Sequence, residues 1–166
     1  MASPPESVLA PSIEEVEARM RPGVFSQGGF LGPNEVLRDV IIQDEEAVHG
    51  LGVTCEWIGE RLEELISSAM DSQARRGAGQ HFKVRLERFK GFQICPWSSA
   101  PHSHQCIVGG GVRFASIDWD ILNRRNGIRM RGPGLTTHLI RDHHFFEGLQ
   151  SPYRLDPKAL VSLLER

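Results

Sequence analysis

The stretch TCEWIGERLEELISSAM, residues 54–70, followed after a linker by HFKVRLERF, residues 81–89, decides the fold class. In the first segment the apolar residues recur at i, i+4, i+7, i+8 and i+11, which predicts an amphipathic helix capped by Thr54. In the second segment Phe82, Val84 and Leu86 alternate with charged residues, which predicts a half-buried strand. The hydrophobic period therefore changes from that of a helix to that of a strand across the polar linker Ser72–Gln80.

The residues before this stretch predict two more helices. IEEVEARM, residues 13–20, is long enough for two helical turns before Pro22 and Gly23 interrupt it. A longer helix is expected from a cap at Asn34 to about His49, where glycines end it. Residues 1–12 contain several prolines and small polar residues, and we interpret them as a loose N-terminal arm.

The residues after the linker predict strands joined by turns. GFQIC, residues 91–95, is expected to continue the first strand, and VRFASIDWDIL, residues 112–122, alternates again. Asn126-Gly127 predicts a tight hairpin turn, from which IRMR, residues 128–131, returns as a strand.

Two helices are expected near the C-terminus. One begins at Thr136 or Thr137 and runs through Glu147 to a stop at Gly148, and the other begins at Asp156-Pro157. The order predicts an α+β fold, with an N-terminal helical layer packed on a small antiparallel sheet and C-terminal helices. We expect a single domain over residues 1–166, with a helical part at 13–71 and a β-rich part with C-terminal helices at 80–166.

The composition excludes several classes of protein. With 40% hydrophobic and 24% charged residues, the chain is globular rather than disordered. No apolar run approaches the roughly 18 residues of a membrane span, so no membrane partner is expected. The first residues lack the basic and apolar regions of a secretory signal, and only three cysteines follow. This combination favours a reducing compartment, and we expect a soluble cytoplasmic protein.

Cysteine and histidine gather in two short segments. CPWSSAPHSHQC, residues 95–106, holds two cysteines and two histidines, and THLIRDHH, residues 137–144, adds three histidines. Zn²⁺ takes four ligands from thiolate, imidazole and carboxylate groups, and Cys₂His₂ is one of its structural ligand sets. We therefore predict a structural zinc site, serving an interaction or regulatory role, with the ligands Cys95, Cys106, His138 and His143.

The arrangement resembles a C₂H₂ zinc finger in one respect. Cysteines at strand ends are followed by a hairpin and then by a helix that carries histidines with H-x₄-H spacing. The cysteine spacing is C-x₁₀-C and 31 residues separate Cys106 from His138, so the resemblance implies geometry and no function. Because i and i+5 diverge by about 140° on an ideal helix, the helix must loosen near its end to direct both histidines at one ion.

Other ligand sets are open on the sequence alone. His102, His104 and His144 are alternative ligands, because H-x-H in a loop presents two imidazoles to one side. A site with three histidines would instead indicate a metal-dependent hydrolase, with Asp142 as a base or as a partner of His138. Cys55 is expected to pack in the core at the start of its helix. Three further carboxylates are interpreted as solvated or structural, namely Asp44, Asp118 and Asp120.

Nucleic-acid binding is the second alternative function. Arginines cluster on the predicted hairpin, and HGLGVTCEWIGERLEELI resembles a helix-turn-helix in its order of helix, glycine and helix. The second of these helices carries four glutamates against one arginine, however, and the net charge is −2. Such a surface repels phosphate, so we do not expect a nucleic-acid partner.

The aromatic residues suggest self-association. Three tryptophans and eight phenylalanines exceed what one small sheet hides, and RDHHFFEG, residues 141–148, places two of these rings beside polar residues. We therefore predict a homo-oligomer, a two-fold dimer, with a further protein partner as an additional role.

Overall fold

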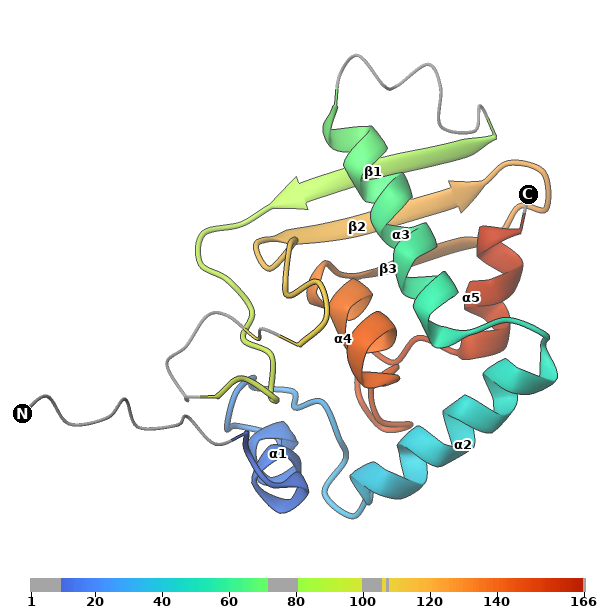
Figure 1. Cartoon of the computed structure of the whole chain (residues 1–166). Coiled ribbons are helices and arrows are strands. Elements are labelled where there is room, and N and C mark those ends of the chain that lie inside the picture. Colours follow the sequence, from blue (N-terminus) through green and yellow to red (C-terminus); the bar gives the residue numbers. More distant parts are fainter. Residues whose placement is uncertain (1–9, 72–80, 100–105, 107, 166) are drawn as a thin grey trace, which may run out of the picture.

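The computed structural model describes residues 10–71, 81–99, 106 and 108–165. Within these residues it has five helices and a three-stranded antiparallel sheet, and the order of elements confirms the α+β class (Figure 1). Most of the predicted N-terminal arm and the linker at 72–80 lie outside the described residues. Among the described residues, no helix combines the length and the apolarity needed to cross a membrane.

The three N-terminal helices begin with different kinds of cap. Helix α1 (Ile13–Met20) starts with a capping box, in which the Ser12 side chain accepts from the Glu15 amide and Glu15 reaches back. Helix α3 (Cys55–Met70) starts at Thr54, as predicted, whose hydroxyl accepts from the Trp57 amide. Helix α2 (Leu37–Gly50) begins later than predicted, because Val36 rather than Asn34 precedes it and supplies no side-chain cap.

The sheet has the order β1-β2-β3, with β1 (Phe82–Arg88) and β3 (Arg129–Pro133) on either side of β2 (Ile117–Asn123). The register places Val84 and Leu86 opposite Ile121 and Trp119, so their side chains share the core face. The predicted hairpin at Asn126-Gly127 joins β2 and β3, with Gly127 at a positive φ of 75°.

The prediction that residues 91–95 continue the first strand is wrong. Gly91 has a φ of 95°, which turns the chain out of the strand conformation. The amides of Phe89 and Gln93 still donate to the carbonyls of Ser116 and Ala115, but no regular ladder continues between them. In the described residues between Arg88 and Ile117, the chain forms neither helix nor strand.

Two helices follow the sheet. Helix α4 (Leu135–His143) has Gly134 as its N-cap and His144 as its C-cap. The predicted N-cap at Thr136 or Thr137 and the predicted end at Gly148 are therefore wrong. Helix α5 (Pro157–Leu164) begins as predicted, with the Asp156 side chain accepting from the Ala159 amide and proline at the first position.

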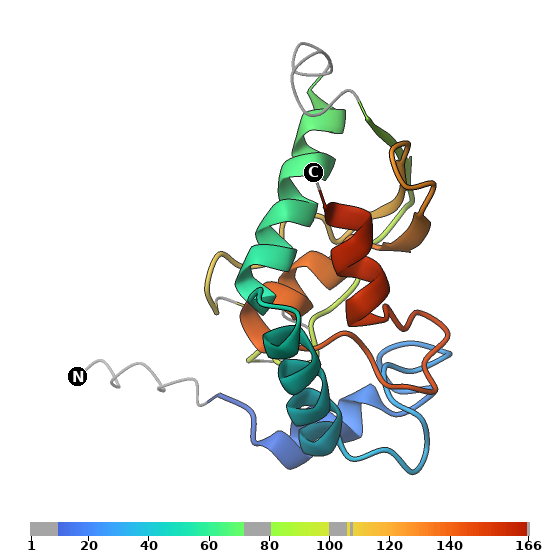
Figure 2. The same cartoon turned by 90° about the vertical axis from the view of Figure 1, so that its right-hand side faces the viewer.

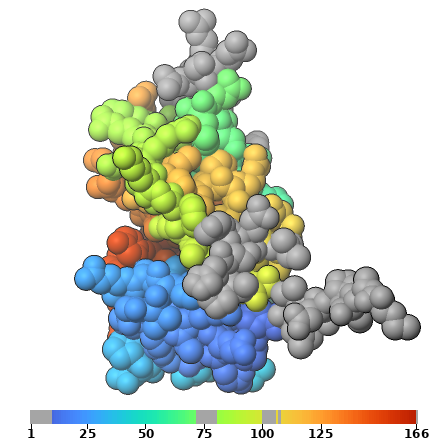
Figure 3. Space-filling view, turned by 90° about the vertical axis from the view of Figure 1, so that its left-hand side faces the viewer, coloured from blue at the N-terminus to red at the C-terminus, as the bar shows by residue number. Residues whose placement is uncertain are grey.

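The helices surround two apolar cores, with α4 between them. The larger core lies where α3 and α5 cover one face of the sheet, and Trp119 and Ile121 are buried there (Figure 2). The smaller core joins α1, the start of α2, α4 and the cysteines Cys95 and Cys106. Figure 3 shows the face where the N-terminal residues meet the segment that follows β1. The smaller core therefore connects the irregular segment to helices from both ends of the chain.

Candidate metal centre

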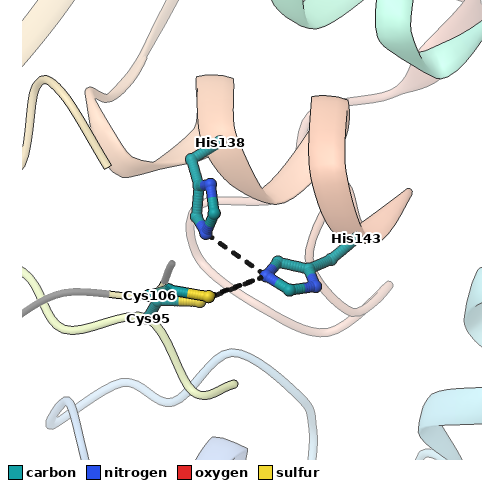
Figure 4. Close-up of side chains that lie close together, drawn as sticks. All are labelled: Cys95, Cys106, His138 and His143. Atoms are coloured by element: carbon teal, nitrogen blue, oxygen red, sulfur yellow. Dashed lines mark hydrogen bonds between the residues drawn. The ribbon is translucent and has the colours of Figure 1, made fainter. Parts of the chain in front are cut away.

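The four residues predicted as metal ligands lie together. One ligand atom from each of Cys95, Cys106, His138 and His143 is within 4.8 Å of the others. The two cysteines come from the irregular segment and the two histidines from α4, and their side chains point toward one another (Figure 4). The segment that carries the two cysteines thus meets α4 in the smaller core.

Both histidines lie on α4, which ends directly after His143. The amide of His144 reaches the carbonyls of Ile140 and Leu139, and the amide of Phe145 reaches Leu139. The bond to Ile140 is a regular i to i−4 bond, whereas the two bonds to Leu139 span five and six residues and close the helix at the left-handed His144. The longer bonds begin only at His144, after both histidines, and the rings of His138 and His143 lie with 4.8 Å between their centroids.

The three ligand-atom distances around His143 are close to the edges of a tetrahedral metal site. His143 Nε2 lies 3.5 Å from the Sγ atoms of both Cys95 and Cys106, and 3.2 Å from His138 Nε2. With Zn–S of about 2.3 Å and Zn–N of about 2.0–2.1 Å, a regular tetrahedron has S···N edges of about 3.6 Å and N···N edges of about 3.3 Å. The cluster could therefore hold one metal ion.

Hydrogen bonding alone does not account for these contacts. His143 Nε2 has two sulfurs and one nitrogen within contact distance, although an imidazole nitrogen donates or accepts one bond. His138 Nδ1 lies 2.7 Å from Asp142 Oδ2, so its proton is best placed on Nδ1, which leaves a lone pair on Nε2. The imidazole lone pairs and the two cysteine sulfurs therefore face a common point, as ligands of a bound cation would.

A buried network holds His138 in position. Asp142, which accepts from His138, also accepts from Arg141 Nε at 3.0 Å and from its terminal nitrogen at 2.6 Å. Arg141 in turn pairs with Glu63 of α3 and donates to the Gly111 carbonyl at 2.9 Å. Burial opposes ionisation of Asp142, but the hydrogen bonds from Arg141 and His138 outweigh it and lower its pKa.

The glycines at 109–111 fit closely around this network. A Cβ at Gly109, whose φ is 58°, would overlap the Asp142 carboxylate, and a Cβ at Gly110 would press on the Arg141 guanidinium. The backbone therefore passes so close to this network at Gly109 and Gly110 that a side chain at either position would collide with it or press on it.

The cysteine thiols have opposite electrostatic environments. Burial raises the pKa of Cys95, whereas a hydrogen bond from Cys95 lowers the pKa of Cys106, with His138 and His143 adding to the effect. The pair therefore favours at least one thiolate, which is the form that binds metals. Outside the cluster, burial raises the pKa of Cys55 to about 12, in agreement with its predicted packing role.

Two residues that the sequence did not point to support the cluster. Trp97 stacks on the His143 ring, with 4.2 Å between centroids and an angle of 6°. Arg19 of α1 donates to the carbonyls of Pro96 and Ser98, and so attaches α1 to the segment that carries Cys95. The proximity of Trp97 to Cys95 in the sequence was a weak signal, but nothing local pointed to Arg19.

The other candidates lie elsewhere or outside the described residues. His102 and His104 belong to the part of the chain that the structure does not describe. His144 turns away, and its two ring nitrogens lie 2.6 Å and 2.7 Å from Glu45 and Glu56. The remaining carboxylates that we had considered have arginine neighbours: Asp44 pairs with Arg154, Asp120 with Arg129, and the pKa of Asp118 reflects burial, Glu87 and Arg131.

In comparisons with known proteins, no protein-family model, no curated protein sequence and no solved structure matches this chain. The functional argument therefore depends on the site itself.

Proposed function

We propose that the chain binds one Zn²⁺ through Cys95, Cys106, His138 and His143, and that the metal is structural. The observation that supports this most strongly is the agreement of the three ligand-atom distances around His143 with tetrahedral edges. Two sulfur and two imidazole ligands in tetrahedral positions suit Zn²⁺ better than harder ions such as Mg²⁺ or Ca²⁺. Asp142 supports this set, as carboxylates commonly do for histidine ligands of zinc.

The ligand set favours structure over catalysis. Four protein ligands complete the zinc tetrahedron, whereas catalytic zinc keeps one position for water. Cys95, Cys106 and His138 are also at most 3% exposed, which restricts access for a substrate. The alternative of a metal-dependent hydrolase therefore has less support, since Asp142 is engaged by Arg141 and His138.

The metal would fix the long irregular segment between β1 and β2. Loops longer than about 12–15 residues without secondary structure are uncommon in compact domains unless they have a function. Here Cys95 and Cys106 attach the segment to α4, and Arg19 attaches it to α1. The segment also exposes apolar side chains, Phe89, Phe92 and Val108, and a metal-fixed loop presents them in one arrangement. We propose that this surface serves an interaction or regulatory role toward a protein partner.

Cobalt substitution tests the ligand set. Replacing the bound metal with Co²⁺ is expected to give intense visible bands of a tetrahedral ion and a thiolate-to-cobalt charge-transfer band. Cys106→Ala should weaken the charge-transfer band and change the visible bands, and His143→Ala should change the visible bands. Cys55→Ala, which removes a buried thiol outside the cluster, should leave the spectrum unchanged. An octahedral spectrum, or a charge-transfer band that survives Cys106→Ala unchanged, would refute the proposal.

A further inference from the structure

A second candidate site lies in a small cavity apart from the metal centre. The cavity has a volume of about 170 Å³ and lies between the loop after α1, the segment after β1 and the loop before α5. None of the four proposed metal ligands lines it. Drug-sized ligands occupy pockets of about 300–1,000 Å³, so this smaller cavity fits only a small molecule or the end of one side chain from a partner.

Aromatic rings form much of the cavity wall. Phe30 is buried, while Phe92 and Tyr153 are 46% and 52% exposed, so rings lie both in the interior and at the accessible part of the site. Phe25 adds a further ring, and the Arg19 guanidinium lies 5.7 Å from its centroid. The faces of such rings attract cations, so the wall is suited to a positively charged group.

The same cavity contains a buried carboxyl group without a cationic partner. Glu147 lines the cavity, is only 2% exposed, and accepts one hydrogen bond from Ser151 Oγ at 2.5 Å. Within the described part of the chain, no lysine, arginine or histidine side chain forms an ion pair with this carboxyl group. Arg154 comes near but pairs with Asp44 and donates to the main-chain carbonyl of Glu147 instead.

Glu147 is costly to keep in this place. Burial raises its pKa to about 7, although the hydrogen bond from Ser151 opposes the shift. Its backbone also has a φ of 67°, a left-handed conformation that residues other than glycine rarely adopt. Strained residues of this kind concentrate at functional sites. The hydrogen bond with Ser151 does not by itself explain a carboxyl group here, because a neutral side chain could accept the same bond.

We propose that this cavity binds a small organic ammonium group, with the Glu147 carboxylate as its counter-charge and the rings of Phe92 and Tyr153 beside it. The cation removes the cost of an unpaired buried carboxylate, and the rings replace part of its hydration. Phe92 lines the cavity, and Cys95, three residues later in the same segment, is part of the candidate metal cluster. A metal bound there would hold this segment in place beside the cavity.

Calorimetric titration of the full chain at pH 8 tests this proposal, because Glu147 is then largely ionised. Choline is the probe, and 3,3-dimethyl-1-butanol, which has nearly the same shape without the charge, is its neutral control. Choline should bind about tenfold more tightly than the alcohol. Lysine and trimethyl-lysine amides, titrated in parallel, distinguish a free small cation from the side chain of a peptide.

Variants separate the carboxylate from the rings. Glu147→Gln should reduce the preference for choline to less than about twofold, and Tyr153→Ala should weaken choline binding severalfold. Because Tyr153 is half exposed, this variant keeps the test valid even if Glu147→Gln fails to fold. Leu149→Ala, which alters an exposed side chain outside the cavity wall, should have no effect. Equal binding of choline and the alcohol, no detectable binding of choline, or an unchanged preference in Glu147→Gln would overturn the proposal.

Discussion

At the scale of single residues, two adjacent histidines have different roles. His143 faces the cysteines, while His144 adopts a left-handed conformation and turns toward Glu45 and Glu56. Both were possible ligands in the sequence analysis, and the spacing from His138 favoured His143. The difference depends on the conformation of one residue at the helix end, which only the surrounding packing determines.

Asp142 is expected to tune the metal site without binding the metal. Asp142→Asn should lower the affinity for Zn²⁺ about 10- to 100-fold, because His138 loses the carboxylate that orients it. Competition with a chromophoric chelator measures the change. Asp120→Asn is a matched control, since it removes a carboxylate that pairs with an arginine on the sheet. Equal affinities of the wild type and Asp142→Asn would show that this contact does not orient the ligand.

Glu147 is expected to make stability depend on pH. Its pKa is about 7 in the folded chain and its ordinary value is 4.5, so the folded state holds the proton more tightly. The resulting stabilisation is complete below pH 4.5 and is lost as the pH rises through 7. The pKa shift of Glu147 from 4.5 to about 7 corresponds to about 3 kcal/mol of unfolding free energy lost between pH 4.5 and 8. Glu147→Gln should lack this part of the pH dependence. Urea unfolding of both proteins across this range measures the difference, and parallel curves would contradict the prediction.

At the scale of elements, local signals predicted most of the regular structure. The caps at Thr54 and Asp156 and the turn at Asn126-Gly127 depend on neighbouring residues, and all three are present. The predictions at residues 91–95 and at the end of α4 failed for a common reason. In both places a residue at positive φ interrupts the regular conformation: Gly91 leaves the strand, and His144 ends α4.

Removing the metal is expected to loosen particular elements. After chelation, amide hydrogen exchange should quicken in residues 89–99 and at the C-terminal end of α4, because both depend on the same ion. The strands β1 and β2 and helix α3 pack in the larger core and should remain protected. Faster exchange throughout the chain, or no change anywhere, would be inconsistent with a local structural metal.

At the scale of the whole molecule, the sequence indicated which residues gather at the candidate metal centre but not what surrounds them. The residue types and spacing predicted the ligand set, but not how the ligands meet, because Arg19, Glu63 and Trp97 are distant or carry no metal signature. In the smaller core Trp97 packs against the cluster that contains the two cysteines. A metal at this point would link both ends of the chain through α4.

Self-association remains a prediction at this scale. Phe145 and Phe146, which had suggested an exposed aromatic patch, are fully buried, so they do not form the contact surface. Trp57, Phe89 and Phe92 are more than a third exposed and are better candidates for it. Light scattering at tens of micromolar protein should give the mass of a dimer, about twice 18.6 kDa. A monomer mass would dismiss the expectation, whatever the state of the metal centre.

Zinc content tests the central claim most directly. Elemental analysis of protein purified without chelator should give about one Zn²⁺ per chain in the wild type and in Cys55→Ala. Cys106→Ala and His143→Ala should retain little metal and should melt at a lower temperature than the wild type. Near-zero zinc in the wild type, or equal zinc in Cys106→Ala and Cys55→Ala, would contradict the account.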